Sequence, residues 1–149
     1  MLIPIKVAMQ HVYAEADDQP QVERKLASAI EIAEQYMGRK IFADTQSLTT
    51  AQTRAETDMS KSLQAVADII NNTTVKSPVL SIKAEIEQSK FEAAKRTMLG
   101  VVINPAIEIG ILMIFGELYK NRENTVDGSI AELPMAAKHH LQPFRIMGV

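Results

Sequence analysis

Apolar residues recur every three or four positions over most of the chain, which is the spacing of one buried face on an α-helix. The clearest case is the range 20–37. Its apolar positions are Val22, Leu26, Ala29, Ala33 and Tyr36 or Met37. Asp18 and Gln21 form a capping-box pattern before it. Pro20 fits a first helical turn, and Gly38 fits a left-handed helix end. The pattern therefore predicts a helix over 20–37.

Residues 39–53 follow this spacing less regularly, and the stretch from Ile41 to Leu48 fits a short extended piece. Helical spacing returns from about Ala55 to Asn71. Its apolar stripe is Met59, Leu63, Val66, Ala67 and Ile70. We therefore predict a second helix over 55–71.

Ser77-Pro78 interrupts the pattern and is expected to be a break. The residues from Leu80 to Ile86 alternate between apolar and polar, which is a strand signal. The following residues are rich in Glu, Ala, Lys and Arg, which favours a helix. We predict a helix from about Ser81 to Leu99. Together with the preceding one, it makes 44–103 a helical segment of its own.

The range Pro105–Tyr119 is the most apolar part of the chain, and Asn104 before it is a typical N-cap. On a helix it forms two apolar rows. The first is Ile109, Leu112, Met113, Gly116 and Tyr119, and the second is Ile107, Ile111, Ile114 and Leu118. Charge is confined to the line Glu108–Phe115–Arg122, and Ala106 and Gly110 leave room for a close neighbour. We therefore expect this helix to be covered from two sides, by its own core and by a neighbouring subunit.

The C-terminal part carries shorter elements. A loop is expected around Val126-Asp127-Gly128, and a short helix from Pro134 to Leu141. The apolar, proline-containing terminus 143–147 follows. Such a terminus is either clamped onto its own domain or offered to a partner.

These elements predict a mainly α fold: a small helical bundle with a central apolar helix and at most minor extended segments. The length of 149 residues suits one domain over 1–149. Aromatic residues make up only 5% and Trp is absent, so Ile, Leu, Val, Ala and the eight Met must build the core.

Charge and cysteine content exclude several classes of function. The net charge is −2, and basic and acidic residues are evenly mixed, so no cluster fits nucleic-acid phosphates. There is no cysteine, hence no disulfide or thiolate metal site. The uncharged run between Glu108 and Glu117 is eight residues long, far too short to span a membrane. The N-terminus lacks the features of a signal peptide, so we expect a protein made in the cytoplasm without membrane contact.

The sequence offers no catalytic or metal-binding constellation, so we expect no enzyme activity, cofactor or metal. His139-His140 are adjacent and therefore point about 100° apart on a helix, which does not suit chelation. Glu108 and Glu117 flank the apolar run and are expected to pair with Lys or Arg. Tyr119 and Arg122 have the spacing of an aromatic–guanidinium pair.

Two blocks of motifs resemble one known family. The first block is Lys6–Val12, the acidic stretch Glu15–Asp18, and the helix Leu26–Met37 ending in Gly38-Arg39. The second is Pro105–Ile107 through Leu118–Glu123, a loop at Gly128, Leu133-Pro134 and Leu141–Arg145. In this order they are similar to the head–tail connector (adaptor) family of tailed bacteriophages and prophages. They cover 1–43 and 104–146, and 44–103 departs from the family pattern as an inserted helical segment.

The resemblance implies a structural protein of the virion neck, made in the cytoplasm of the host bacterium. Such a protein forms a homo-oligomeric ring, commonly a dodecamer, beneath the portal protein. The ring continues the DNA channel without specific DNA binding and offers a platform to the next neck or tail-completion protein.

The resemblance and the apolar helix together suggest two groups of contact residues. Those expected at the subunit interface are Ile107, Ile111, Ile114, Leu118, Tyr119 and Arg122. Those expected to contact the portal are Pro134, Leu141, Pro143, Phe144 and Arg145. For the first group, packing inside the chain's own core is the alternative. A different function also stays open, that of a small helical dimeric binding or regulatory module without enzymatic activity, which would bury the same stripe pairwise.

Overall fold

A computed structural model describes residues 2–71, 78–121 and 133–147. Its elements, in chain order, are helix α1 (Ile5–Val12), the 3-10 turn η1 (Ala16–Asp18), α2 (Gln19–Met37), strand β1 (Ile41–Phe42), α3 (Thr45–Asn71), α4 (Pro78–Met98), β2 (Val101–Val102), α5 (Pro105–Lys120), α6 (Met135–Leu141) and η2 (Gln142–Phe144). The predicted mainly α fold is confirmed.

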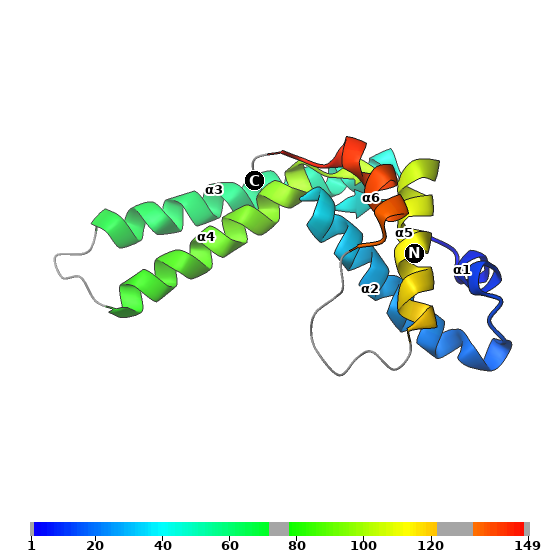
Figure 1. Ribbon diagram of the computed structural model, residues 1–149. Helices are drawn as coiled ribbons and strands as arrows, with labels where there is room; N and C mark the ends of the chain where they lie inside the picture. Colours follow the sequence, from blue (N-terminus) through cyan, green and yellow to red (C-terminus); the bar gives the residue numbers. More distant parts are fainter. Residues whose placement is uncertain (1, 72–77, 122–132, 148–149) are drawn as a thin grey trace.

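The helices divide into two groups (Figure 1). Helices α1, α2, α5 and α6 pack together, and we call this group the body. Helices α3 and α4 run side by side away from it as an antiparallel pair, which we call the arm. The buried core that surrounds α5 contains no residue of the arm. The arm helices thus form their own layer, whereas the description of 44–103 as an insertion stays a prediction.

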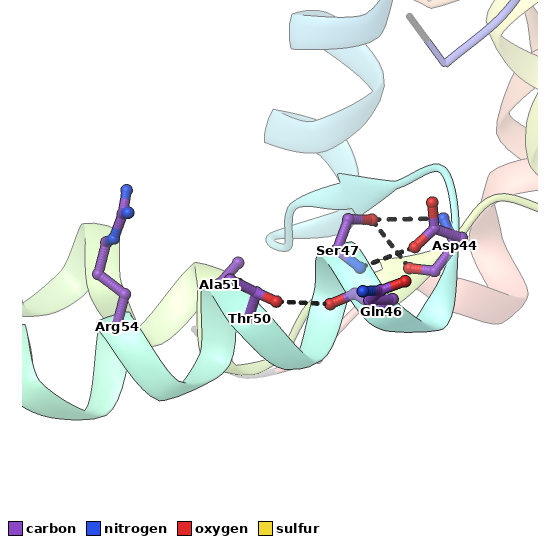
Figure 2. Close-up of a pocket in the computed structure, with 6 residues that line it drawn as sticks. All are labelled: Asp44, Gln46, Ser47, Thr50, Ala51 and Arg54. Atoms are coloured by element: carbon purple, nitrogen blue, oxygen red, sulfur yellow. Dashed lines mark hydrogen bonds between the residues drawn. The ribbon is translucent and has the colours of Figure 1, made fainter.

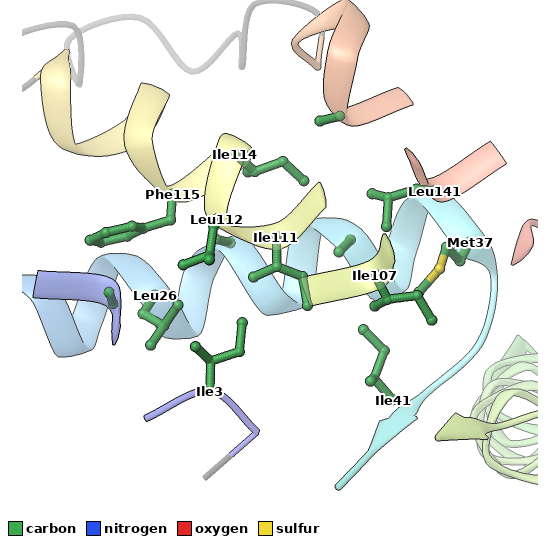
Figure 3. Packing of buried hydrophobic residues seen from close by; sticks show 14 of the residues in the cluster. Ile3, Leu26, Met37, Ile41, Ile107, Ile111, Leu112, Ile114, Phe115 and Leu141 are labelled. Carbon is green, nitrogen blue, oxygen red and sulfur yellow. The ribbon is translucent and has the colours of Figure 1, made fainter. Parts of the chain in front are cut away.

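The core of the body lies around α5, with α2 along one side of it (Figure 3). Its fully buried large side chains are Phe115, Ile3, Leu26, Met37, Ile107, Ile111, Leu141 and Val22. They come from both ends of the chain, because the segment before α1 and helix α6 each place one side chain in this cluster. The N- and C-terminal blocks therefore fold as one unit.

The two strongest sequence signals are confirmed. Helix α2 spans Gln19–Met37, and Gly38 ends it with φ of 72°, in the left-handed region that glycine adopts without strain. Helix α5 begins at Pro105, and the side chain of Asn104 accepts a hydrogen bond from the backbone N–H of Ile107 at 3.0 Å. Helix α6 ends at Leu141, also as expected.

The start of α2 differs from the predicted capping box. The side chain of Asp18 makes no capping hydrogen bond, because η1 leads directly into α2 and gives Asp18 a helical backbone. Its carboxylate instead accepts a hydrogen bond from the hydroxyl of Tyr119, at 2.8 Å. Helix α1, which precedes η1, was not predicted from the pattern.

Both arm helices begin earlier than predicted. Helix α3 starts at Thr45, so the expected extended piece shrinks to the two residues of β1. The polar, threonine-rich start of α3 has Leu48 as its one large apolar residue and has modest helix propensity, which hid it from a search for apolar spacing. Four threonine hydroxyls there donate to the carbonyl four residues earlier. The expected break at Ser77-Pro78 lies at a helix boundary, because Pro78 is the first residue of α4, where its missing N–H has no helical partner to lose.

A short parallel strand pair holds the base of the arm. Ile41 pairs with Val101 and Phe42 with Val102, so the two ends of the arm segment meet. Gly100 lies against this base, and a Cβ there would come within 2.6 Å of the Phe42 ring and 2.8 Å of Leu48. The close approach of these side chains to the backbone therefore requires glycine.

The arm is built like an antiparallel coiled coil. On α3 one line of buried and half-buried positions runs in steps of three and four: Leu48, Gln52, Ala55, Met59, Ser62, Val66 and Ile69. On α4 the same steps give Leu80, Ala84, Glu87, Phe91, Ala94 and Met98. This is the heptad spacing with which two helices pack along one seam. Near the base, the amide Nε2 of Gln52 donates to the carbonyl of Met98 at 2.9 Å and aligns the two helices.

Candidate interaction surfaces

The row of α5 that was expected to face a neighbouring subunit is used inside the chain. Ile107 and Ile111 are completely buried, and Ile114 is 3% exposed. In this structure no part of these side chains is left for a partner, so the alternative of core packing describes all three. Phe115, which the helical wheel placed on the charged line, is also completely buried.

Both covers of α5 come from its own chain. Helix α2 packs on one side, and α1 and α6 pack on others. The expected close approach at Gly110 is made by α6, because a Cβ at this position would lie 2.9 Å from Leu141. A second subunit is therefore not needed to cover α5.

The two glycines of α5 give a matched test of this packing. Gly110→Ala is expected to destabilise the body by about 1 kcal/mol or more, because overpacking against buried Leu141 outweighs the gain in helix propensity. At Gly116 a Cβ would meet His11 at 3.5 Å, an ordinary contact, so Gly116→Ala is expected to stabilise by up to about 1 kcal/mol. Thermal unfolding measures both, and a stabilised Gly110→Ala would contradict the packing of α6 on α5.

The end of α5 contacts the start of α2. Tyr119 is half-buried and donates its hydroxyl to Asp18, and its ring packs near that of Phe115, with centroids 5.9 Å apart. Leu118 is half-buried, and its carbonyl accepts a hydrogen bond from Lys25. Arg122, and with it the expected pair with Tyr119, lies outside the described residues.

The C-terminal segment is clamped onto the end of α2. The guanidinium of Arg145 lies 5.0 Å above the ring centre of Tyr36, and the Tyr36 hydroxyl donates to the side chain of Gln142. The backbone N–H of Ile146 donates to the carbonyl of Met37 at 2.9 Å. Of the two alternatives for this terminus, clamping is the one found for residues up to Ile146.

The residues expected to contact the portal are therefore divided between inner and outer positions. Leu141 is completely buried in the body core and is not available to a partner. Pro134 and Phe144 are half-buried, while Pro143 and Arg145 are exposed. A portal contact at the exposed pair stays a prediction.

The arm also presents exposed apolar side chains outside its seam. On α3 these are Leu63 and Ile70, which are 57% and 68% exposed. On α4 they are Val79, Ile82 and Ile86, which are 59%, 56% and 49% exposed. The predicted stripe of α3 mixed these positions with the seam residues, and the pairing of α3 with α4 separates them.

A shallow polar hollow lies where α3 leaves the body (Figure 2). Its volume is about 400 Å³, and its lining includes Asp44, Ser47 and Arg54. The carboxylate of Asp44 accepts a hydrogen bond from the backbone N–H of Ser47 at 2.7 Å, which caps α3. This bond, with a second from the Ser47 side chain, lowers the pKa of Asp44 below its ordinary value. The polar groups here serve the helix end, and the hollow does not suggest a reaction.

The remaining candidate groups are the carboxylates of α5 and the histidines of α6. Glu117 is exposed and accepts a hydrogen bond from Asn121 at 2.7 Å, and Glu108 is half-buried. His139 is exposed and His140 half-buried on α6. Among residues 2–71, 78–121 and 133–147, no three His, Cys, Asp or Glu side chains gather as a metal site. Within the same ranges, no helix is both long and apolar enough to cross a membrane.

Comparison of the chain with models of protein families, with curated proteins and with solved structures gives no match.

Proposed function

We propose that this protein is a structural component of the neck of a tailed phage or prophage, a head–tail connector. In this proposal, copies of the chain form a ring that docks on the portal protein and continues the DNA channel. The far side of the ring receives the next neck or tail-completion protein. The proposal rests on the family resemblance of the two motif blocks.

The observation that carries the proposal is that the two blocks meet in one body. Asp18 from the acidic stretch of the first block accepts the hydroxyl of Tyr119 from the second. Tyr36, just before the Gly-Arg turn, lies beneath Arg145 of the terminal motif. Motif residues that are far apart in sequence thus hold the same fold together. This supports the view that they form one family pattern and not a chance collection of short matches.

The position of the departing segment agrees with this view. The range 44–103 leaves the body and returns to it through the paired strands β1 and β2. The body core contains no side chain from the two arm helices, whereas Val101 and Ile103 at the end of this range pack against it. An additional segment of this kind leaves the fold of the two blocks intact, so the departure from the family pattern does not weaken the resemblance.

The even charge distribution is compatible with a channel wall. A net charge of −2 without a basic cluster gives little attraction to phosphate, so DNA would slide past instead of being held.

A second candidate is a dimeric helical binding or regulatory module. It is favoured by the apolar side chains on the arm, because two copies could bury those of one arm face pairwise in a four-helix arrangement. It requires a stable dimer that never forms rings.

Size-exclusion chromatography with light scattering separates the two candidates. The connector is expected to give ring-sized oligomers, either alone at high concentration or when mixed with the portal protein of the same phage. A stable dimer under all conditions would favour the binding module. A monomer at every concentration, also with portal protein present, would contradict both candidates.

A further inference from the structure

The outer half of the arm carries two apolar rows that its own seam does not cover. On α3 the row consists of Leu63, Ala67 and Ile70, and all three are exposed. On α4 it consists of Val79, Ile82 and Ile86, also exposed. Both rows have steps of three and four, so each follows one side of its helix. Exposed apolar groups arranged in this way mark an interaction surface.

The two rows lie on different faces of the arm. Each residue of the α3 row follows a seam residue by one position, which turns it about 100° away from the seam in one direction. In the α4 row, Val79 and Ile86 precede seam residues by one position, which turns them the other way around their helix. Ile82 lies near the back of α4. One partner helix pair therefore cannot cover both rows at the same time.

The rows also lie at matching heights along the arm. Leu63 is eight residues before the end of α3 at Asn71, and Ile86 is eight residues after the start of α4 at Pro78. The hydrogen bond from Gln52 to Met98 fixes the relative height of the two helices. Ala67 matches Ile82, and Ile70 matches Val79, by the same count. Ala67 and Ile82 lie in the middle of the rows, and Ile70 and Val79 lie at the tip of the arm.

We propose that each arm packs between the arms of two neighbouring copies, with the α3 row of one chain against the α4 row of the next. A contact between two different faces is head-to-tail, and it closes into a ring when the rotation between copies allows. Rotation about a ring axis keeps every residue at its own height, so rows at matching heights meet in register. This contact adds a subunit interface to the ring of the proposed function, and the closure of the contact into a ring rests on that proposed function.

The size of the rows favours a ring over an isolated pair. The rows run over Leu63–Ile70 and Val79–Ile86, each about 12 Å along a helix about 10 Å wide, so one contact buries roughly 120 Å² on each chain. Both sides together give roughly 240 Å², well below the roughly 1,200 Å² of a stable pair of proteins. In a ring each chain makes the contact twice, and closure adds to its strength.

Cross-linking of introduced cysteines tests this contact directly, since the natural chain has none. Ala67→Cys and Ile82→Cys are made in separate full-length chains, mixed, and treated with a short bis-maleimide. The mixture is expected to give at least ten times more cross-linked dimer than either variant alone. Lys61→Cys mixed with Ile82→Cys is the control, because Lys61 is exposed on the other side of α3. Ile70→Cys with Val79→Cys is a second pair at matching height.

Three results would overturn the proposal. Ala67→Cys alone could cross-link as well as the mixture, which would indicate a symmetric contact between identical faces. The second is a yield of cross-linked dimer from the Lys61 control that equals the yield from the Ala67 mixture. The third is a yield of cross-linked dimer that is no higher for either pair than for the single variants, which would mean that something other than this chain covers the rows. Circular dichroism confirms beforehand that each variant keeps its helical content, which is expected because the substituted side chains are exposed.

The same experiment separates this proposal from the proposed function. Rings that form without cross-links between the arms would leave the connector function standing and remove the arm contact. Cross-links in the expected pairs, without rings and without binding to portal protein, would keep the arm contact and remove the connector function.

Discussion

Phe115→Ala is expected to lower the free energy of unfolding by about 3–5 kcal/mol, a large part of the stability of a domain this size. The ring of Phe115 is completely buried in the body core (Figure 3). Its removal takes away apolar contact and leaves a cavity that neighbouring helices fill only partly. In a chain of 149 residues this corresponds to a fall in melting temperature of roughly 10 °C or more.

Ile109→Ala is the matched control for this experiment. Ile109 lies on the same helix but is 42% exposed, so its removal is expected to cost about 1 kcal/mol or less. Thermal unfolding followed by circular dichroism compares the two. If Phe115→Ala kept the melting temperature and changed only the assembly state, α5 would face a partner and the core described here would be wrong.

Replacement of the arm is expected to abolish self-association and leave the body folded. The change joins Asp44 to Leu99 through a short Gly/Ser linker in place of residues 45–98. The body should still unfold in one cooperative transition, because its core cluster contains no side chain from the arm and its two strands stay paired. Light scattering should then find a monomer at concentrations at which the full chain assembles.

Leu63→Glu with Ile70→Glu is the milder version of the same test. It keeps the arm and places two charges in the α3 row, so assembly should be lost while helical content is unchanged. A shortened chain that is unfolded would show that the arm is part of the cooperative fold. A shortened chain that still assembles as the full chain does would show that the body, and not the arm, holds the copies together.

Elements with local signals at both ends were predictable from the sequence. Helices α2 and α5 combine apolar spacing with residues that favour a helix start or end, such as Asn104 and Gly38, and both were found where expected. The start of α3 was missed because its threonines give no apolar spacing. The start of α4 was missed because proline ends one helix as readily as it begins another.

The covering of α5 could not be predicted, because it depends on where distant helices pack. The sequence correctly required two covers for α5. Whether the second cover is another subunit or α6 of the same chain depends on tertiary contacts such as that between Gly110 and Leu141. Phe115 shares a helical line with Glu108 but is completely buried, so the charged line is covered at the level of Phe115.

The apolar rows of the arm were present in the sequence but could not be interpreted there. Leu63 and Ile70 were grouped with the seam residues Met59 and Val66 in one stripe. Only the pairing of α3 with α4 shows which of them the arm itself buries. The surface that now leads the account of assembly thus differs from the α5 surface that the sequence suggested.

Negative-stain imaging of the full chain, alone at high concentration and with the portal protein of the same phage, shows whether the copies assemble into rings. A connector is expected to give closed rings of uniform diameter, formed by the chain itself or on the portal. Single particles the size of one chain in both samples, with no rings, would contradict the proposed connector function.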